Sequence, residues 1–186
     1  MPMRIVAGSH KGRRLVAPSG LTARPTADRV RQALFDILAH SDLVDLEGAT
    51  VIDAFAGSGA LGLEALSRGA ARAWFMDIHP QSLASVRANV ETLREEARTR
   101  LIRADAIHPP AAEAACTLAF LDPPYHGGLA APALAALAAA GWLASGALAV
   151  VEVAADEDFV PPAGFTLADS RRHGPAQIAF VVRAET

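Results

Sequence analysis

Residues 50–62 read TVIDAFAGSGALG and decide the fold. An apolar run containing Asp53 leads into three glycines, Gly57, Gly59 and Gly62, spaced as G-x-G-x-x-G. A short strand that passes through such glycines into a helix is a common first unit of a doubly wound α/β sheet. The glycines permit a tight turn and a close approach of the backbone to a ligand. Dinucleotide-binding proteins share this spacing, so other residues must identify the ligand.

Short apolar runs alternate with helical patterns on both sides of this loop. The apolar runs lie at residues 50–54, 72–76, 100–103, 118–121 and 147–153, and the helical patterns at residues 60–68, 80–98 and about 130–140. Continuous apolar strands that alternate with helices predict a mostly parallel sheet covered on both faces. Residues 164–170 and 177–183, joined by residues 171–175, predict a closing antiparallel hairpin. The expected fold class is therefore α/β, a doubly wound Rossmann-like sheet of seven strands that binds its ligand at the carboxyl ends of the strands.

The first 40 residues depart from this alternation. Two short apolar alternations at residues 4–7 and 14–17 predict a small hairpin, and Thr26 is placed to cap a helix that runs to about His40. We expect residues 1–40 to form a basic N-terminal arm and residues 41–186 to form the main domain. Together they are expected to make one compact unit.

The composition excludes several classes of protein. The chain has 186 residues, of which 52% are hydrophobic and 20% charged, the balance of a globular domain. Its single cysteine, Cys116, excludes a disulfide framework and a cysteine-based zinc site, and the six histidines show no metal-ligand spacing. Residues 127–151 carry no charge, but Pro132, Gly141 and Gly146 favour a helix, a turn and a buried strand over a membrane span. No apolar core follows the charged N-terminus, so we expect no signal peptide and a cytoplasmic protein.

The formal net charge of −3 is the sum of two parts of opposite sign. Residues 1–31 contain seven basic side chains and one acidic one, a net charge of +6, whereas the other 155 residues have a net charge of −9. A basic segment attached to an acidic body favours contact with RNA phosphates over the alternative of a solvated face. The candidate RNA-binding residues are Lys11, Arg13, Arg14, Arg24, Arg29 and Arg31.

Acidic residues follow three of the expected strands. Asp53 would repel a pyrophosphate but attract an ammonium or sulfonium group. Asp77 lies 20 residues after Gly57, where a carboxylate accepts both ribose hydroxyls. Asp105 either receives an adenine amino group or caps a helix. These acids favour S-adenosylmethionine over NAD. The alternative is that the loop is only a structural turn and that the acids cap the strand ends. The candidate cofactor-binding residues are Asp53, Ala56, Gly57, Ser58, Gly59, Asp77, Ile78, Asp105 and Ala106.

Residues 122–125 read Asp-Pro-Pro-Tyr and follow the fourth expected strand. Two adjacent prolines fix φ and remove two backbone donors, so the segment is rigid and presents its carbonyl groups. The Asp122 carboxylate and the Pro123 carbonyl would accept the two N–H groups of an exocyclic amine, and Tyr125 would stack on a base swung out of its helix. We therefore expect in-line methyl transfer, with Asp122, Pro123, Pro124 and Tyr125 as catalytic residues. The structural alternative is a rigid turn at the strand exit.

This segment and the Gly-x-Gly loop together resemble the amino-group methyltransferases of nucleic acids. Residues 4–15, 24–31 and 53–70 are similar to the RsmD family of small-subunit ribosomal RNA guanine methyltransferases, and the similarity covers essentially the whole chain. The resemblance implies a class I S-adenosylmethionine-dependent methyltransferase that modifies the 2-amino group of one guanine in 16S rRNA. The partner it implies is 16S rRNA within a partly assembled small ribosomal subunit. We expect the protein to bind neither a membrane nor a metal. The family often has Phe in place of Tyr125, which keeps the stacking face, and Glu in place of Asp77, an aspartate that is shorter but chemically equivalent.

Three alternative functions stay open. An NAD-dependent oxidoreductase would use the same glycine loop, but it gives the Asp-Pro-Pro-Tyr segment and the basic arm no role, and Asp53 disfavours it. A non-catalytic RNA-binding or assembly factor would keep the fold without needing an intact Asp122. An amino-methylase of DNA, or of RNA with another target base, would share the motif, although the chain is short for a DNA methylase. Residues 156–164 match no pattern.

Overall fold

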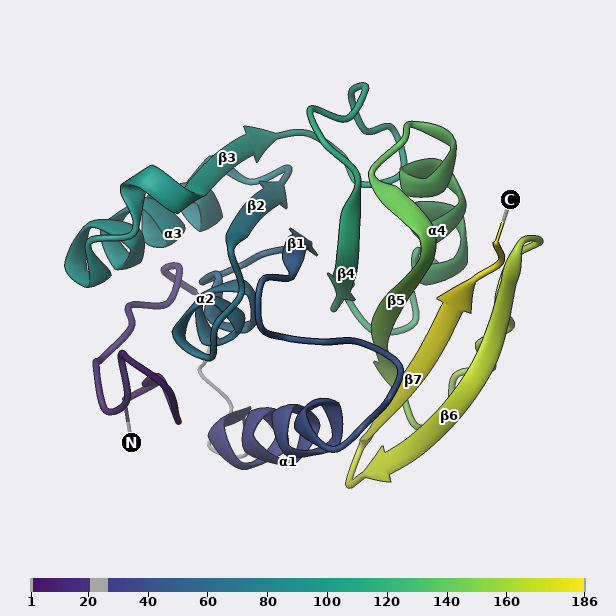
Figure 1. Cartoon of the computed structure of the whole chain (residues 1–186), viewed down its shortest axis with the longest axis horizontal. Helices are drawn as coiled ribbons and strands as arrows, with labels where there is room; N and C mark the ends of the chain where they lie inside the picture. The colour runs from purple at the N-terminus through teal and green to yellow at the C-terminus, as the bar shows by residue number, and fades with distance from the viewer. Residues whose placement is uncertain (1, 21–26, 186) are drawn as a thin grey trace.

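Strand β1 (Thr50–Ala54) is the third strand of a seven-stranded sheet with the strand order β3-β2-β1-β4-β5-β7-β6 (Figure 1). The computed structural model describes residues 2–20 and 27–185, so Arg24 and the expected cap Thr26 lie outside the described residues. The other strands are β2 (Arg72–Asp77), β3 (Thr99–Arg103), β4 (Cys116–Leu121), β5 (Leu143–Ala154), β6 (Phe165–His173) and β7 (Ala176–Arg183).

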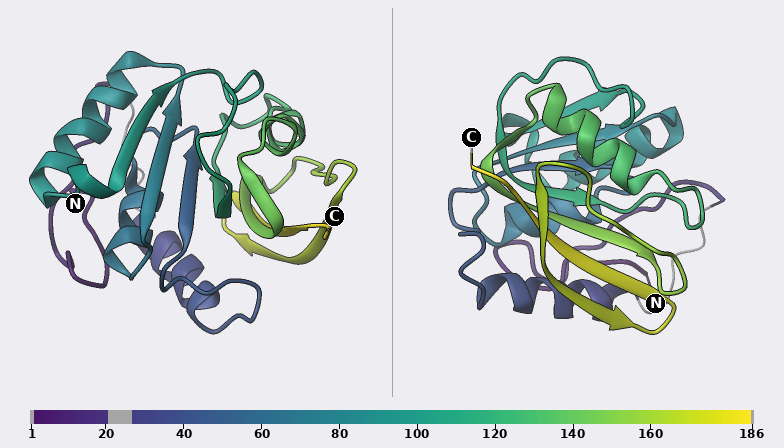
Figure 2. Two further views of the ribbon diagram at one scale, coloured as in Figure 1. Left: turned by 45° about the horizontal axis from the view of Figure 1, so that its top comes forward. Right: turned by 90° about the vertical axis from the view of Figure 1, so that its right-hand side faces the viewer.

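The first five strands of the sheet are parallel, and the last two form an antiparallel hairpin. β1 pairs with β2 and with β4, β2 with β3, and β4 with β5, all in the parallel sense. β7 runs antiparallel to both β5 and β6. The predicted α/β class, the seven strands and the closing antiparallel hairpin are confirmed. The right-hand view of Figure 2 shows the hairpin at the end of the sheet.

Helices cover both faces of the sheet, as the continuous apolar strands predict. Side chains of α1 (Ala27–Ala39), α2 (Ala60–Ser67) and α3 (Pro80–Leu93) pack in one buried cluster with Val51 and Phe120. α4 (Ala130–Ala139) packs in a second cluster with Ile52 and Leu121, on the opposite face. Alternate residues of each strand therefore belong to opposite layers, and Figure 2 shows the layers from two sides.

The N-terminal arm packs against the first layer. Arg4 and Arg14 form an isolated antiparallel bridge, so the expected hairpin is reduced to a single bridge within a loop. Ile5 and Leu15 are buried in the same cluster as α1. The carboxylate of Glu64 in α2 accepts the N–H groups of Val6 and Ala7, both at 2.9 Å. The arm is thus hydrogen-bonded to the helix that follows the glycine loop.

Two element boundaries differ from the expectation for local reasons. The helix predicted over residues 80–98 ends at Leu93, because Arg94 adopts a left-handed conformation (φ 59°), and a short 3-10 turn follows at Glu96–Arg98. β5 begins at Leu143 rather than residue 147, and its pairing with β4 shifts register between Cys116 and Leu118. Within the described residues, no helix is long and apolar enough to cross a membrane.

Candidate active site

The carboxyl ends of β1, β2 and β4 meet at one edge of the sheet. Ala54 is paired with Met76 of β2 and with Leu121 of β4, so the residues that follow these strands lie at the same level. The glycine loop, Asp77 and Asp122 come together there. This is the edge at which doubly wound sheets bind their ligands.

The glycine loop is held by contacts to its neighbours. Gly57 and Gly59 have positive φ angles of 57° and 78°. The N–H of Gly57 donates to Oδ2 of Asp77 at 2.9 Å, and the side-chain amide of Asn89 donates to the Ser58 carbonyl at 2.9 Å. A Cβ added to Gly57 would meet nothing within 4 Å, so the space over this part of the loop is open.

Gly62 has a different role from the other two glycines. A Cβ at Gly62 would lie 2.5 Å from Cε1 of Phe75 and 3.3 Å from Cβ of Asp53. The absence of a side chain therefore lets α2 approach the sheet closely at its first turn.

Asp53 is buried against that first turn, with 2% of its surface exposed. Its Oδ2 accepts the N–H of Gly62 at 2.9 Å. Burial raises the pKa of the Asp53 carboxyl well above its usual range; the Gly62 N–H works against this, and the Asp122 and Asp77 carboxylates raise it further. Three carboxyl groups thus act on one another at this edge, and Asp53 supports the loop from behind.

Asp77 and Asp105 both hold the backbone that follows them. Oδ1 of Asp77 accepts the N–H of His79 at 2.8 Å, and Oδ1 of Asp105 accepts the N–H of Ile107 at 3.1 Å. The sequence suggested a helix cap as the alternative role of Asp105, but a turn follows it instead of a helix, so this contact is an Asx turn. Among the other candidates, Ile78 is 51% exposed, whereas Ala56 and Ala106 are buried.

The Asp122–Tyr125 segment leaves β4 at the same edge. Asp122 and Pro124 are exposed, Pro123 is buried and Tyr125 is half-buried. The Tyr125 hydroxyl donates to Oε1 of Glu152 in β5 at 2.7 Å. Sequence reasoning missed Glu152, although one signal was present: it is the single charged residue of the run at residues 143–154.

Of the candidate RNA-binding residues, Lys11, Arg13, Arg14 and Arg29 are exposed. Nη2 of Arg13 donates to the Thr92 carbonyl at the end of α3, at 2.6 Å. The structure therefore sets these four side chains on the surface of the arm and of α1, and Arg24 lies outside the described residues.

The assignment of Arg31 to the RNA-contacting set needs correction. Arg31 is 5% exposed, and its guanidinium forms an ion pair with Asp28 at 2.8 Å, approaches Glu64 at 3.4 Å and donates to the Arg4 carbonyl. A charge count along the chain cannot separate a surface cation from one that neutralises a buried acid, and Glu64 is fully buried.

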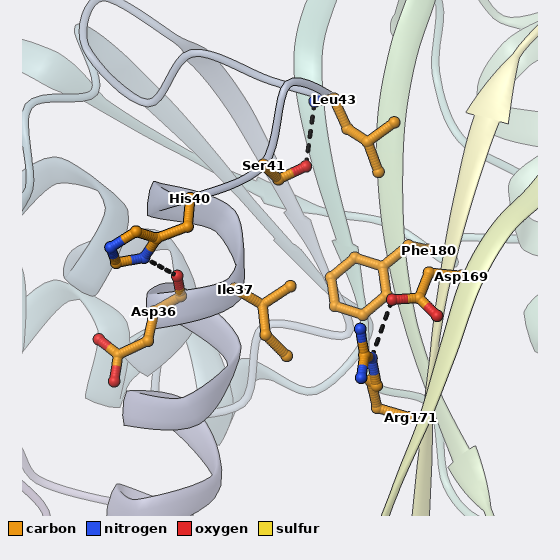
Figure 3. A pocket seen from close by; sticks show the side chains of 8 residues that line it. All are labelled: Asp36, Ile37, His40, Ser41, Leu43, Asp169, Arg171 and Phe180. Carbon is orange, nitrogen blue, oxygen red and sulfur yellow. Dashed lines mark hydrogen bonds and ion pairs between the residues drawn. The ribbon is translucent and has the colours of Figure 1, made fainter.

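A separate open groove of about 470 Å³ lies between α1 and the β6–β7 hairpin. Figure 3 shows Ile37 of α1 and Phe180 of β7 facing its space, with Asp169 and Arg171 joined by an ion pair at its rim. None of the candidate catalytic, cofactor-binding or RNA-binding residues is among those that line it.

In the described ranges, no three His, Cys, Asp or Glu side chains are grouped to hold a metal ion.

Comparison with known proteins adds an independent line of evidence. The profile of a family described as Conserved hypothetical protein 95 matches residues 3–182. The ribosomal RNA small subunit methyltransferase D of Haemophilus influenzae is 34% identical over 176 residues, which cover 92% of this chain and 89% of that relative. The protein of the same name from Escherichia coli is 40% identical over 151 residues, covering 81% of this chain and 74% of the relative. A solved structure of the yhhF protein of Escherichia coli superposes with a TM-score of 0.84 at 33% identity, with 100% of both chains covered.

Proposed function

The chain belongs to the RsmD family, and on this premise we propose that it transfers a methyl group from S-adenosylmethionine to the 2-amino group of a guanine in small-subunit ribosomal RNA. The relatives' names supply the ribosomal RNA and the methyl transfer. The donor is inferred from the acidic residues of this chain, and the guanine 2-amino group is what the resemblance to the family implies. One observation carries the proposal: the Asp122–Tyr125 segment and the glycine loop leave adjacent parallel strands at the same level of the sheet.

The residues at this edge fit S-adenosylmethionine. The open space over Gly57 leaves room for a ligand beside the loop. The Asp77 and Asp122 carboxylates give the edge a negative potential, which favours a sulfonium cation and disfavours a pyrophosphate. Asp77 and Asp105 would hold the ribose and the adenine, and the loop residues 56–59 would line the methionine portion. The same charge argument disfavours the oxidoreductase alternative.

Bound there, S-adenosylmethionine would supply an electrophilic methyl group. The Asp122 carboxylate and the Pro123 carbonyl would each accept one N–H of the guanine 2-amino group, which turns the nitrogen lone pair out of conjugation with the ring. After transfer, the nitrogen carries one proton too many, and the exposed Asp122 is placed to accept it and pass it to solvent. Tyr125 would stack on the base and hold it in place. The chain thus acts by positioning and electrostatics, without a covalent intermediate.

The arm would provide the sequence-independent part of RNA binding. Lys11, Arg13 and Arg14 are exposed, Arg13 lies beside the end of α3, and Arg29 is exposed on α1. Contacts of such side chains with phosphates position an RNA without reading its sequence. We propose this role for the described members of the set and, by position in the sequence, for Arg24.

The test is transfer of a labelled methyl group to naked 16S rRNA, to DNA and to partly assembled small subunits, followed by mapping of the modified base. The expected product is N2-methylguanine in RNA. Asp122→Ala should abolish transfer, because its carboxylate acts on the base, and should leave S-adenosylmethionine affinity within about twofold, because Asp77 still supplies negative charge at the edge. Methylation of an adenine, or full activity of the Asp122→Ala protein, would refute the proposal.

A further inference from the structure

The end of β5 carries an acidic side chain that has no assigned role. Glu152 lies between Val151 and Val153, which are buried in the layer of α4. Successive side chains of a strand point to opposite faces, so Glu152 points to the face that also carries Asp53. A half-buried charged group on an interior strand of the sheet is costly unless it is hydrogen-bonded.

The strand register brings Glu152 beside the Asp122–Tyr125 segment. Leu121 of β4 is paired with Val151 of β5, so Asp122 and Glu152 follow at the same level on two adjacent parallel strands. The chain then turns through two prolines and returns Tyr125 to β5, where its hydroxyl donates to Glu152 at 2.7 Å. A phenol that donates to a carboxylate makes one of the stronger kinds of hydrogen bond.

A second acid holds the backbone that follows Tyr125. Oε2 of Glu157 accepts the N–H groups of His126 at 3.0 Å and of Ala154 at 3.1 Å. His126 has a φ of 60°, an uncommon conformation for a non-glycine residue, and the hydrogen bond to its N–H stabilises the carboxylate and lowers the pKa of Glu157. The segment is thus fixed at its backbone by Glu157 and at the tip of its aromatic ring by Glu152.

We propose that Glu152 is a positioning residue for the target base: through the Tyr125 hydroxyl it fixes the tilt of the ring on which the base stacks. The inference rests on the proposed function. The prolines determine where the ring starts, but the two side-chain torsions of a tyrosine leave its plane free to rotate. The hydrogen bond at the far end of the ring removes that freedom before the base arrives, and this preorganisation lowers the entropic cost of capture.

A double-mutant cycle separates this role from direct contact of Glu152 with the base. Glu152→Ala and Tyr125→Phe should each lower kcat/KM for RNA about tenfold, mostly through KM, because each removes one side of the same hydrogen bond. The double variant should be no worse than either single one. Losses that multiply to about 100-fold, or a Glu152→Ala protein as active as the parent, would overturn the proposal.

A conservative variant and a matched control distinguish positioning from a general effect on folding. Glu152→Gln keeps an oxygen that accepts the phenol and should recover most of the activity lost in Glu152→Ala. Asp158→Ala removes an exposed acid six residues further along the chain from Glu152 and should leave kcat/KM unchanged. If Glu152→Gln is as poor as Glu152→Ala while both unfold at the same temperature, the negative charge itself acts in the reaction and the positioning role is wrong.

One spectroscopic measurement does not depend on activity. The chain has a single tyrosine, so selective ¹³C labelling gives one Cζ signal, whose chemical shift reports the hydrogen bond of the hydroxyl. Glu152→Ala should move this signal toward that of free tyrosine, and Asp158→Ala should not. An unmoved signal in Glu152→Ala refutes the positioning contact even if RNA methylation is confirmed. If the parent protein methylates no RNA while the signal moves, the proposed function fails and the contact stands.

Discussion

Replacing Gly62 with alanine tests the close approach of α2 to the sheet. The added Cβ would lie 2.5 Å from Cε1 and 2.9 Å from Cζ of Phe75, whose ring is fully buried. Overpacking of this kind costs up to about 3 kcal/mol. Alanine in place of glycine inside a helix returns about 1 kcal/mol. We therefore expect Gly62→Ala to lower the free energy of unfolding by about 2 kcal/mol.

For a chain of this length, that loss corresponds to a fall in Tm of about 4–8 °C, measured by circular dichroism. A second substitution checks the cause. Phe75→Leu removes the two ring atoms that clash, so it should cost less stability in the Gly62→Ala background than in the parent protein, by more than about 1 kcal/mol.

A Gly62→Ala protein as stable as the parent would show that α2 moves away from the sheet without cost, so that the close packing there does not require a glycine. Equal costs of Phe75→Leu in both backgrounds would show that the destabilisation has another origin. Either result would also weaken the assignment of Gly62 to a packing role and leave it as part of the ligand loop.

Three other predictions concern charged groups. Glu157→Ala should lower kcat/KM for RNA several-fold and Glu157→Gln should restore it, because an amide oxygen still accepts the His126 N–H; steady-state kinetics measure both. Arg31→Ala should destabilise the fold by about 3–5 kcal/mol in urea unfolding, because the buried Glu64 carboxylate loses one of its cationic partners. The same variant should leave the salt dependence of RNA binding unchanged, whereas replacing Arg13 and Arg14 with Glu should reduce it. Filter binding at several salt concentrations measures this dependence. Because the pKa of Asp53 is raised in the folded state, the folded protein holds the Asp53 proton more tightly than the unfolded chain does. The stability that this proton contributes is complete below the usual carboxyl pKa and is lost as the pH rises through the raised pKa. Asp53→Asn should therefore make the free energy of unfolding depend less on pH in that range, and an unchanged dependence would refute the raised pKa.

The sheet and the location of the site could be predicted because their signals are local. An apolar run followed by glycines, or by Asp-Pro-Pro, marks a strand end wherever it occurs, and parallel strands bring such ends to one edge. The loop and residues 122–125 therefore met where the pattern predicted. The helix end at Arg94 could not be predicted, because nothing in its neighbourhood, such as a glycine, marks a left-handed residue.

The roles of Arg31, Glu64 and Glu152 depend on contacts between segments distant in sequence. Arg31 belongs to a run of basic residues, and only its position opposite Glu64 turns it inward. Glu152 gains its partner through the register of β5 with β4 and the return of residues 122–125. A local pattern shows that such residues are charged, but it cannot show which partner neutralises them.

The attachment of the arm to α2 and α3 has a consequence for the growing chain. The partners of the arm backbone lie 58 residues downstream at Glu64 and 73 residues downstream at Asn89, which accepts the N–H of Val16. At a synthesis rate of about 5–20 residues per second, roughly 4–15 s pass before the second partner exists. This cationic segment is therefore made before the residues that hold it, and during that interval it is an unattached polycation beside the ribosome that makes it.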